Sequence, residues 1–136
     1  MTTPIASSDG GSRMISIDSY GWIERLLEGP KAPAYNRVFS SVPTEEIVTS
    51  VVTVYEVYKK LRPMKGESAA LSAVVHLRAT ELVPFDDQLA LEAADYSLSL
   101  RLHFSHAIIY ATAQRFGAEL HTSDPELRGL PGVVFH

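Results

Sequence analysis

Short apolar runs alternate with longer helix-like segments along most of the chain, and this alternation limits the fold more than any other feature. Strand-like runs are expected at Met14–Ile17, Ile47–Thr49, Glu81–Phe85, Glu119–Thr122 and Val133–Phe135. Helices between strands imply right-handed crossovers and parallel pairing. The runs are short and apolar, as burial on both faces requires. The pattern predicts an α/β fold: a three-layer α/β/α sandwich with a short, mostly parallel sheet of four to five strands.

Apolar spacing and helix-end signals locate the helices between these strands. Helices are predicted over residues 19–28, 34–40, 67–79 and 87–100. Ser50 is expected to cap a further helix that runs to Leu61, before Pro63. Ser105 is expected to cap the helix from His106 to Phe116, which Gly117 closes.

The length of 136 residues is enough for one domain with a hydrophobic core and too short for two. Residues 1–13 are rich in Ser, Thr and Gly, and we expect them to form a flexible tail ahead of a domain over residues 14–136. No apolar run approaches the roughly 18 residues that cross a bilayer, and the start has no apolar core typical of a secretory signal. These features favour a cytoplasmic protein without membrane association.

Composition excludes several kinds of chemistry. The chain has no cysteine, which rules out disulfides, thiolate catalysis and Cys-based zinc sites. The formal net charge is −4, with 12 basic and 16 acidic residues. A protein that coats nucleic acid through a broad basic face is normally positive. Any phosphate-containing substrate must therefore be held locally.

Three acidic residues lie where an apolar run gives way to a helix or loop: Asp18, Glu56 and Asp124. The carboxyl ends of parallel strands meet at one edge of a sheet, where ligands bind. Carboxylates gathered there repel each other unless a cation lies between them, so the pattern indicates a divalent metal site. Taken alone, Asp18 could instead cap the following helix, and Asp124, before Pro125, could be a turn residue.

Four stretches in register resemble the PIN-domain ribonucleases, most closely the small VapC-like toxins of toxin–antitoxin pairs. They are ISIDS at 15–19, SVVTVYEV at 50–57, HAIIYATA at 106–113 and TSD at 122–124. The family's four acidic positions are Asp, Glu, Asp and Asp. Asp18, Glu56 and Asp124 match three of them, and His106 occupies the remaining Asp position.

The resemblance implies a metal-dependent endoribonuclease toxin that uses one or two Mg²⁺ or Mn²⁺ ions to hydrolyse RNA phosphodiesters. The implied metal ligands are Asp18, Glu56 and Asp124, with His106 at the catalytic site, and Ser19 and Thr122 match polar positions beside the acids. Such an ion polarises the phosphodiester and lowers the pKa of an attacking water. The implied partners are RNA, a cognate antitoxin and a second copy of the chain. Residues expected to line an antitoxin groove are Trp22, Leu26, Tyr35, Val38 and Phe39.

His106 sets this chain apart from the family pattern. An imidazole removes one negative charge from the acidic cluster, so Mg²⁺ is expected to bind more weakly and Mn²⁺ to be relatively favoured. Alternatively, His106 as an imidazolium could supply part of the cation's charge. A degenerate PIN domain that binds protein or RNA without cleaving it is therefore the alternative function. A phospho-acceptor receiver domain is rejected, because Asp18 stands alone and no lysine follows Lys65.

Overall fold

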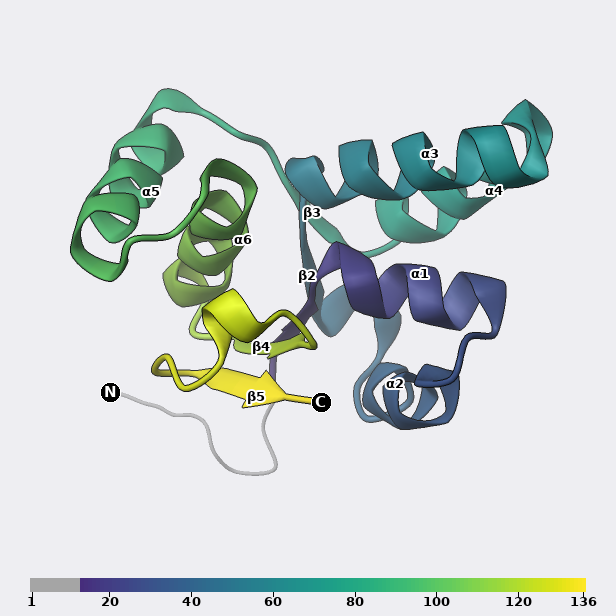
Figure 1. The fold of residues 1–136 in the computed structure, drawn as a ribbon, viewed down its shortest axis with the longest axis horizontal. Helices are drawn as coiled ribbons and strands as arrows, with labels where there is room; N and C mark the ends of the chain where they lie inside the picture. The colour runs from purple at the N-terminus through teal and green to yellow at the C-terminus, as the bar shows by residue number, and fades with distance from the viewer. Residues whose placement is uncertain (1–12) are drawn as a thin grey trace.

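The computed structural model describes residues 13–136, and residues 1–12 of the expected tail lie outside the described part. A five-stranded sheet in the order β3-β2-β1-β4-β5 forms the centre of the molecule (Figure 1). Every neighbouring pair is parallel. The strands are β1 (Ile15–Ile17), β2 (Ile47–Ser50), β3 (Glu81–Val83), β4 (Glu119–Thr122) and β5 (Val133–Phe135). The predicted parallel α/β fold is confirmed.

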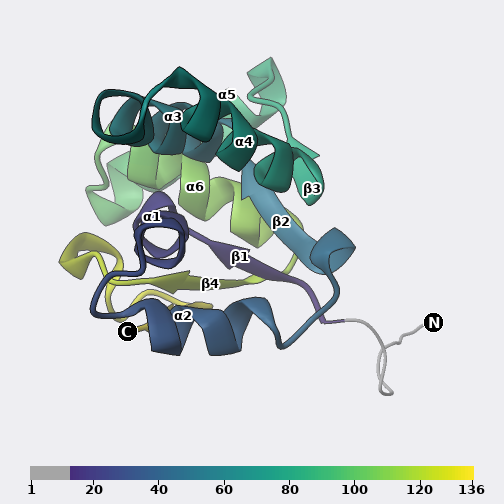
Figure 2. The ribbon, with the colours of Figure 1, turned by 90° about the vertical axis from the view of Figure 1, so that its right-hand side faces the viewer.

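Six α-helices connect these strands within the described residues. They are α1 (Ser19–Leu27), α2 (Ala32–Phe39), α3 (Val51–Lys65), α4 (Glu67–Arg78), α5 (Asp87–Leu100) and α6 (Phe104–Arg115). Two short 3₁₀ turns, η1 (Thr44–Glu46) and η2 (Pro125–Leu127), precede β2 and β5. Helices α5 and α6 lie on one side of the sheet in Figure 1, and α1 to α4 lie on the other. Figure 2 shows the same layers from the side, with α6 and α2 on opposite sides of β1 and β4.

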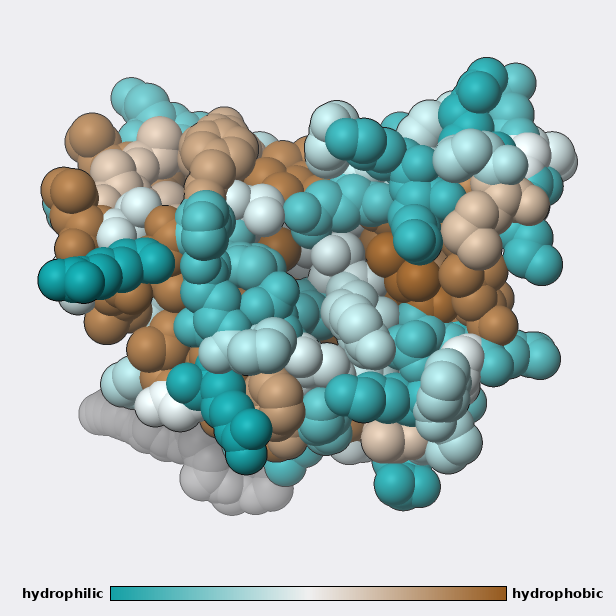
Figure 3. All heavy atoms as spheres, viewed as in Figure 1, coloured by the Kyte–Doolittle hydropathy of each residue, from teal (hydrophilic) through white to brown (hydrophobic). Residues whose placement is uncertain are grey.

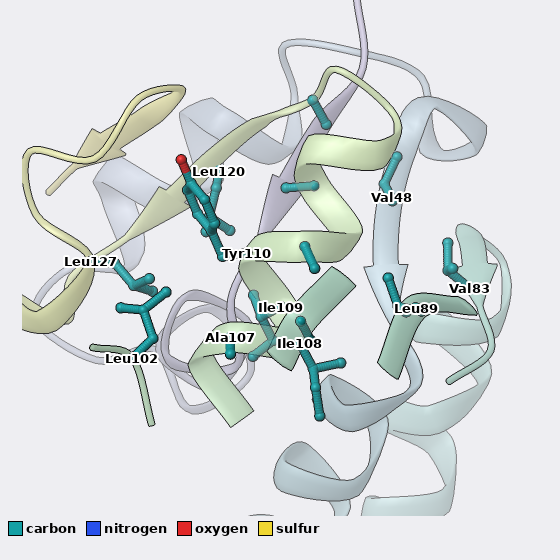
Figure 4. Packing of buried hydrophobic residues seen from close by; sticks show 14 residues of the cluster. Val48, Val83, Leu89, Leu102, Ala107, Ile108, Ile109, Tyr110, Leu120 and Leu127 are labelled. Atoms are coloured by element: carbon teal, nitrogen blue, oxygen red, sulfur yellow. The ribbon is translucent and has the colours of Figure 1, made fainter. Parts of the chain in front are cut away.

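Alternating side chains of the strands feed two separate hydrophobic cores. Ile15, Ile17 and Ile47 pack with the helices α1 to α4. Val48 and Leu120 point to the other face, toward α6 (Figure 4). A sheet buried on both faces needs apolar residues at successive strand positions, which explains why the strands read as continuous apolar runs.

The helix boundaries differ from the sequence-based prediction at three places. Helix α6 begins at Phe104 with His103 as its N-cap, so the predicted cap at Ser105 is wrong. Helix α3 continues through Pro63 to Lys65, because its last turn is completed by the Gly66 amide donating to the Arg62 carbonyl. Helix α2 begins two residues earlier than predicted, with Pro33 in its first turn, where a missing N–H costs little.

None of the helices within residues 13–136 combines the length and the apolar character that crossing a membrane would demand.

Candidate active site

The site is built where the connections of the sheet change direction. From the central strand β1 the chain moves to β2 and β3 on one side, and then returns to β4 and β5 on the other. The crevice at the carboxyl ends of β1 and β4 is therefore a topological switch point, where α/β proteins bind ligands. Asp18 directly follows β1 and Asp124 follows β4, so both lie at this edge. The Asp18 amide also donates to the His121 carbonyl of β4 at 3.2 Å.

Asp18 is a buried carboxylate, only 3% exposed. It caps α1: its Oδ1 accepts from the Gly21 amide at 3.1 Å, and its Oδ2 accepts from the Thr122 hydroxyl. Burial raises the pKa of Asp18 from the ordinary 3.8 to about 6, although both hydrogen bonds and the nearby His106 oppose this shift. Asp124 adds to the rise, so Asp18, His106 and Asp124 lie within electrostatic range of one another.

Thr122 links the two acids. While its hydroxyl donates to Asp18, its Oγ1 accepts from the Asp124 amide at 2.9 Å. The side chain is fully buried at the end of β4. Its polar position beside the acids, expected from the sequence, thus has a defined geometry. Ser19 is half-buried at the first position of α1, and its role at the site stays a prediction.

His106 lies in the first turn of α6 between two carboxylates. Its Nε2 is 2.9 Å from Asp124 Oδ2, and its Nδ1 contacts Glu126 Oε1. The second oxygen of Glu126 contacts Nδ1 of His103. Desolvation tends to raise the pKa of Glu126, but hydrogen bonds from His106 and His103 outweigh it and hold this pKa below its usual range.

Glu126 and His103 are site residues that sequence reasoning missed. Glu126 follows Asp124 by two residues, inside the turn η2, and the Asp124 carboxylate accepts from its amide at 2.9 Å. His103 precedes His106 by one helical turn. The sequence offered two signals for these residues: an acid two positions beyond Asp124 and a histidine one turn before His106. Only the fold shows that the two side chains meet.

Glu56 lies half-buried in α3, which follows β2. Within residues 13–136, no hydrogen bond or ion pair joins it to Asp18, His106 or Asp124, and no group of three or more His, Asp and Glu side chains could hold one metal ion. The structure thus brings Asp18, His106 and Asp124 together and leaves Glu56 unconnected to them. Its role as a ligand stays a prediction.

The residues expected to line an antitoxin groove divide into two groups. Trp22, Leu26 and Phe39 border a surface pocket of about 450 Å³. Tyr35 is fully buried, and its hydroxyl is 2.7 Å from Ser123 Oγ beneath the site. Val38 is also buried in the core. The pocket is thus lined by three of the five expected side chains.

The fold, the buried Asp18 and the half-buried Asp124 place the protein among α/β domains with an acidic site at the switch point of a parallel sheet. The model of the PIN domain matches residues 17–133, and the chain belongs to this family. The resemblance found in the sequence is confirmed. No curated protein matches the sequence.

Solved structures of toxin–antitoxin proteins have a similar fold. A chain of a toxin–antitoxin complex from Klebsiella pneumoniae is 23% identical, with a TM-score of 0.74, over 88% of this chain and 95% of that one. VapC20 of Mycobacterium tuberculosis is a toxin that cleaves the sarcin–ricin loop. It is 18% identical, with a TM-score of 0.64, over 77% of this chain and 85% of its own. A chain of VapBC2 from Rickettsia felis, bound to a promoter DNA fragment, is 13% identical, with a TM-score of 0.69, over 90% of this chain and 97% of that one.

Proposed function

We propose that the chain is an endoribonuclease toxin of a toxin–antitoxin pair, in which His106 weakens or abolishes the hydrolysis of RNA phosphodiesters. The observation that supports this most directly is the pair Asp18 and Asp124, joined through Thr122 at the switch point of the sheet. An acid held there at 3% exposure costs folding free energy, so its retention favours a functional role. VapC20, which is similar in fold, is a toxin that cleaves RNA at the sarcin–ricin loop.

The proposed cofactor is Mg²⁺ or Mn²⁺, with Asp18, Glu56 and Asp124 as its ligands. Carboxylate oxygens suit these ions. The arrangement of the side chains does not fit an ion at Asp124, however, because His106 Nε2 occupies its Oδ2 at 2.9 Å. Activity with Mg²⁺ is therefore expected to be weak or absent, with Mn²⁺ favoured over Mg²⁺.

The test compares the protein with its His106→Asp variant on a mixed pool of tRNA and rRNA, with Mg²⁺ and, separately, with Mn²⁺. The variant restores the family's fourth acid and removes the imidazole from Asp124, so cleavage should rise. An Asp18→Asn change in the same background should abolish this gain. Equal cleavage and equal metal affinity with and without the His106→Asp change would contradict a role of His106 at the metal site.

A degenerate PIN domain that binds protein or RNA without cleaving it is the second candidate. It is favoured by the same contact between His106 and Asp124, which leaves the acidic edge paired within the chain. If neither the protein nor its His106→Asp variant cuts RNA, this second candidate becomes the better supported function.

The proposed protein partner is an antitoxin. Structural neighbours were crystallised as toxin–antitoxin complexes. The pocket bordered by Trp22, Leu26 and Phe39 offers apolar contacts for a partner helix, and it lies on the side of the sheet that carries α1 and α2. Helix-in-groove recognition uses such pockets for its apolar anchors.

A homodimer is also proposed. Apolar side chains gather over α5 and the start of α6, seen at the left edge of Figure 3. Leu98 is 82% exposed and Phe104 is 71% exposed. The rings of Phe104 and Phe85 meet edge to face at 6.0 Å, beside an apolar pocket of about 330 Å³. Contiguous exposed apolar surface of this kind is typical of protein–protein interfaces.

A further inference from the structure

The outer face of α3 carries aromatic and basic side chains in alternation. Tyr55, Tyr58, Lys59 and Arg62 follow one another at helical spacing, so they share one face of the helix. Tyr55 is 62% exposed, Lys59 and Arg62 are exposed, and Tyr58 is half-buried. A different face of α3, which includes the fully buried Val57, packs into the core. The four residues therefore form an aromatic–basic stripe that the packing of α3 does not require.

Each basic group of the stripe lies beside the tyrosine one turn before it. Lys59 Nζ is 5.4 Å from the ring centroid of Tyr55, within the range of a cation–π contact, and donates to its hydroxyl at 3.4 Å. Arg62 Nε donates to the Tyr58 hydroxyl at 3.1 Å. Of the lysines and arginines within residues 13–136, Arg62 and Arg115 are the ones that pair with acids. The charge of Lys59 is therefore not neutralised by a neighbouring acid.

The stripe starts at the edge of the sheet where the acids lie. Ser50, the last residue of β2, caps α3, and β2 is the parallel neighbour of β1, which Asp18 follows. Helices α1 and α3 thus start at the same edge, and they contact each other (Figure 1). Tyr20, at the second position of α1, is 43% exposed, and Lys31 Nζ is 5.6 Å from its ring centroid. The same ammonium donates to the His136 carbonyl, which holds it in place.

We propose that these two Tyr–Lys pairs form a track for single-stranded RNA, in which Tyr20 and Tyr55 stack on unpaired bases and Lys31 and Lys59 contact phosphates. Every base has a π-face, so stacking on an exposed ring tolerates any sequence. A chain with a net charge of −4 cannot hold RNA through a broad basic face, and the two lysines supply positive charge locally. The bases of a duplex stack on one another, so the track selects unpaired segments. RNA as the ligand of this edge is taken from the proposed function, on which the track rests.

Binding to a short labelled single-stranded RNA tests the track, with fluorescence anisotropy of the full-length protein in EDTA. Tyr55→Leu should bind about tenfold more weakly than the wild type, the order of one base–aromatic stack. Tyr55→Phe keeps the ring and should bind as the wild type does. Lys59→Gln should reduce the slope of log affinity against log salt concentration by about 0.7, the value for one phosphate contact on a single strand. Lys60→Gln is the matched control, because it removes the same charge from an exposed position of α3 beside the stripe, and the slope should stay unchanged.

The wild type alone gives a second test, which needs no folded variant. It should bind the single strand about tenfold more tightly than a duplex of the same sequence. No binding, or equal binding of the duplex, would overturn the proposal. So would wild-type affinity in Tyr55→Leu, or equal slopes for Lys59→Gln and Lys60→Gln. If sedimentation velocity shows that Tyr55→Leu dissociates a dimer, a second copy covers the stripe and the proposal is wrong.

Failure of the track and failure of the proposed nuclease give different results, because EDTA separates binding from cleavage. RNA that binds through Tyr55 but is cut neither by the protein nor by its His106→Asp variant would overturn the nuclease and support the track. RNA that is cut while Tyr55→Leu binds it as tightly as the wild type would overturn the track alone.

Discussion

At the scale of single residues, the two acids of the site cap the elements that follow their strands, as the sequence allowed. Asp18 caps α1 and Asp124 caps η2, yet both lie at the switch point of the sheet. A cap and a place at the switch point coincide because a helix or turn starts within a few residues of each strand end, and its free N–H groups need an acceptor there. One oxygen of each acid faces backbone amides, and the other meets Thr122 or His106.

The raised pKa of Asp18 predicts how stability depends on pH. The folded protein holds this proton up to about pH 6, whereas the unfolded chain releases it near the ordinary value of 3.8. Between these values the folded state binds more protons, so this group's contribution to stability is complete below the lower value and falls as pH rises. The loss is roughly 3 kcal/mol in full. Urea unfolding at a series of pH values from acid to neutral measures it.

Asp18→Asn isolates this contribution, because an asparagine does not titrate and its one side-chain carbonyl oxygen can still accept from the Gly21 amide, while its NH2 group faces the Thr122 hydroxyl oxygen. The wild type should lose stability relative to the variant as pH rises toward 6. Asp95→Asn, at an exposed position of α5, is the control and should follow the wild-type curve. Parallel curves for the wild type and Asp18→Asn would show that Asp18 has an ordinary pKa.

At the scale of elements, a tertiary contact explains why one helix begins at a different residue from the one that local sequence signals predicted. Ser105 has the side chain of a good cap, but α6 starts one residue before it. The His103 amide donates to Glu126, 23 residues further along the chain, so this amide is satisfied from outside the helix. A helix cap predicted from neighbouring residues cannot take account of a partner so far along the chain. The cap at Ser50, whose hydroxyl accepts from the nearby Val52 amide, was predicted correctly.

The contact of α1 with β1 and α2 depends on Gly21. A Cβ at this position would lie 2.5 Å from both Ile17 Cγ2 and Tyr35 Cε1, and both of these side chains are buried. Gly21→Ala should therefore destabilise the protein by about 1–3 kcal/mol, because overpacking outweighs the better helix propensity of alanine. Chemical denaturation measures the change. Ser68→Ala, at an exposed position of α4, should leave stability nearly unchanged, and an equally stable Gly21→Ala protein would disprove the close packing.

At the scale of the whole molecule, the order of the strands decides which acids meet. Asp18 and Asp124 come together because β1 and β4 are neighbours in the sheet, with Ile17 opposite His121. Glu56 instead depends on α3, which follows β2. The crossover rule predicts parallel strands but not their order, since several orders satisfy it.

The apolar surface over α5 predicts self-association. Leu98→Glu combined with Phe104→Glu should shift the protein from dimer to monomer, because burying two carboxylates in an apolar interface is costly. Sedimentation velocity measures the mass. Val75→Glu, at an exposed apolar position of α4, should leave the dimer intact. A dimer that survives the double change but dissociates with Val75→Glu would place the interface on α4.

The sequence was enough to predict the class of fold, and it singled out Asp18, His106 and Asp124, which lie together at the carboxyl edge of the sheet. Strand and helix periods and local caps depend on neighbours within a few positions, so one chain suffices to read them. The pairing of Asp18 with Asp124 through Thr122, and the hold of Glu126 on His103 and His106, were decided by the tertiary structure alone. These contacts join segments up to 104 residues apart, and only packing of the sheet and helices brings their side chains within hydrogen-bonding distance.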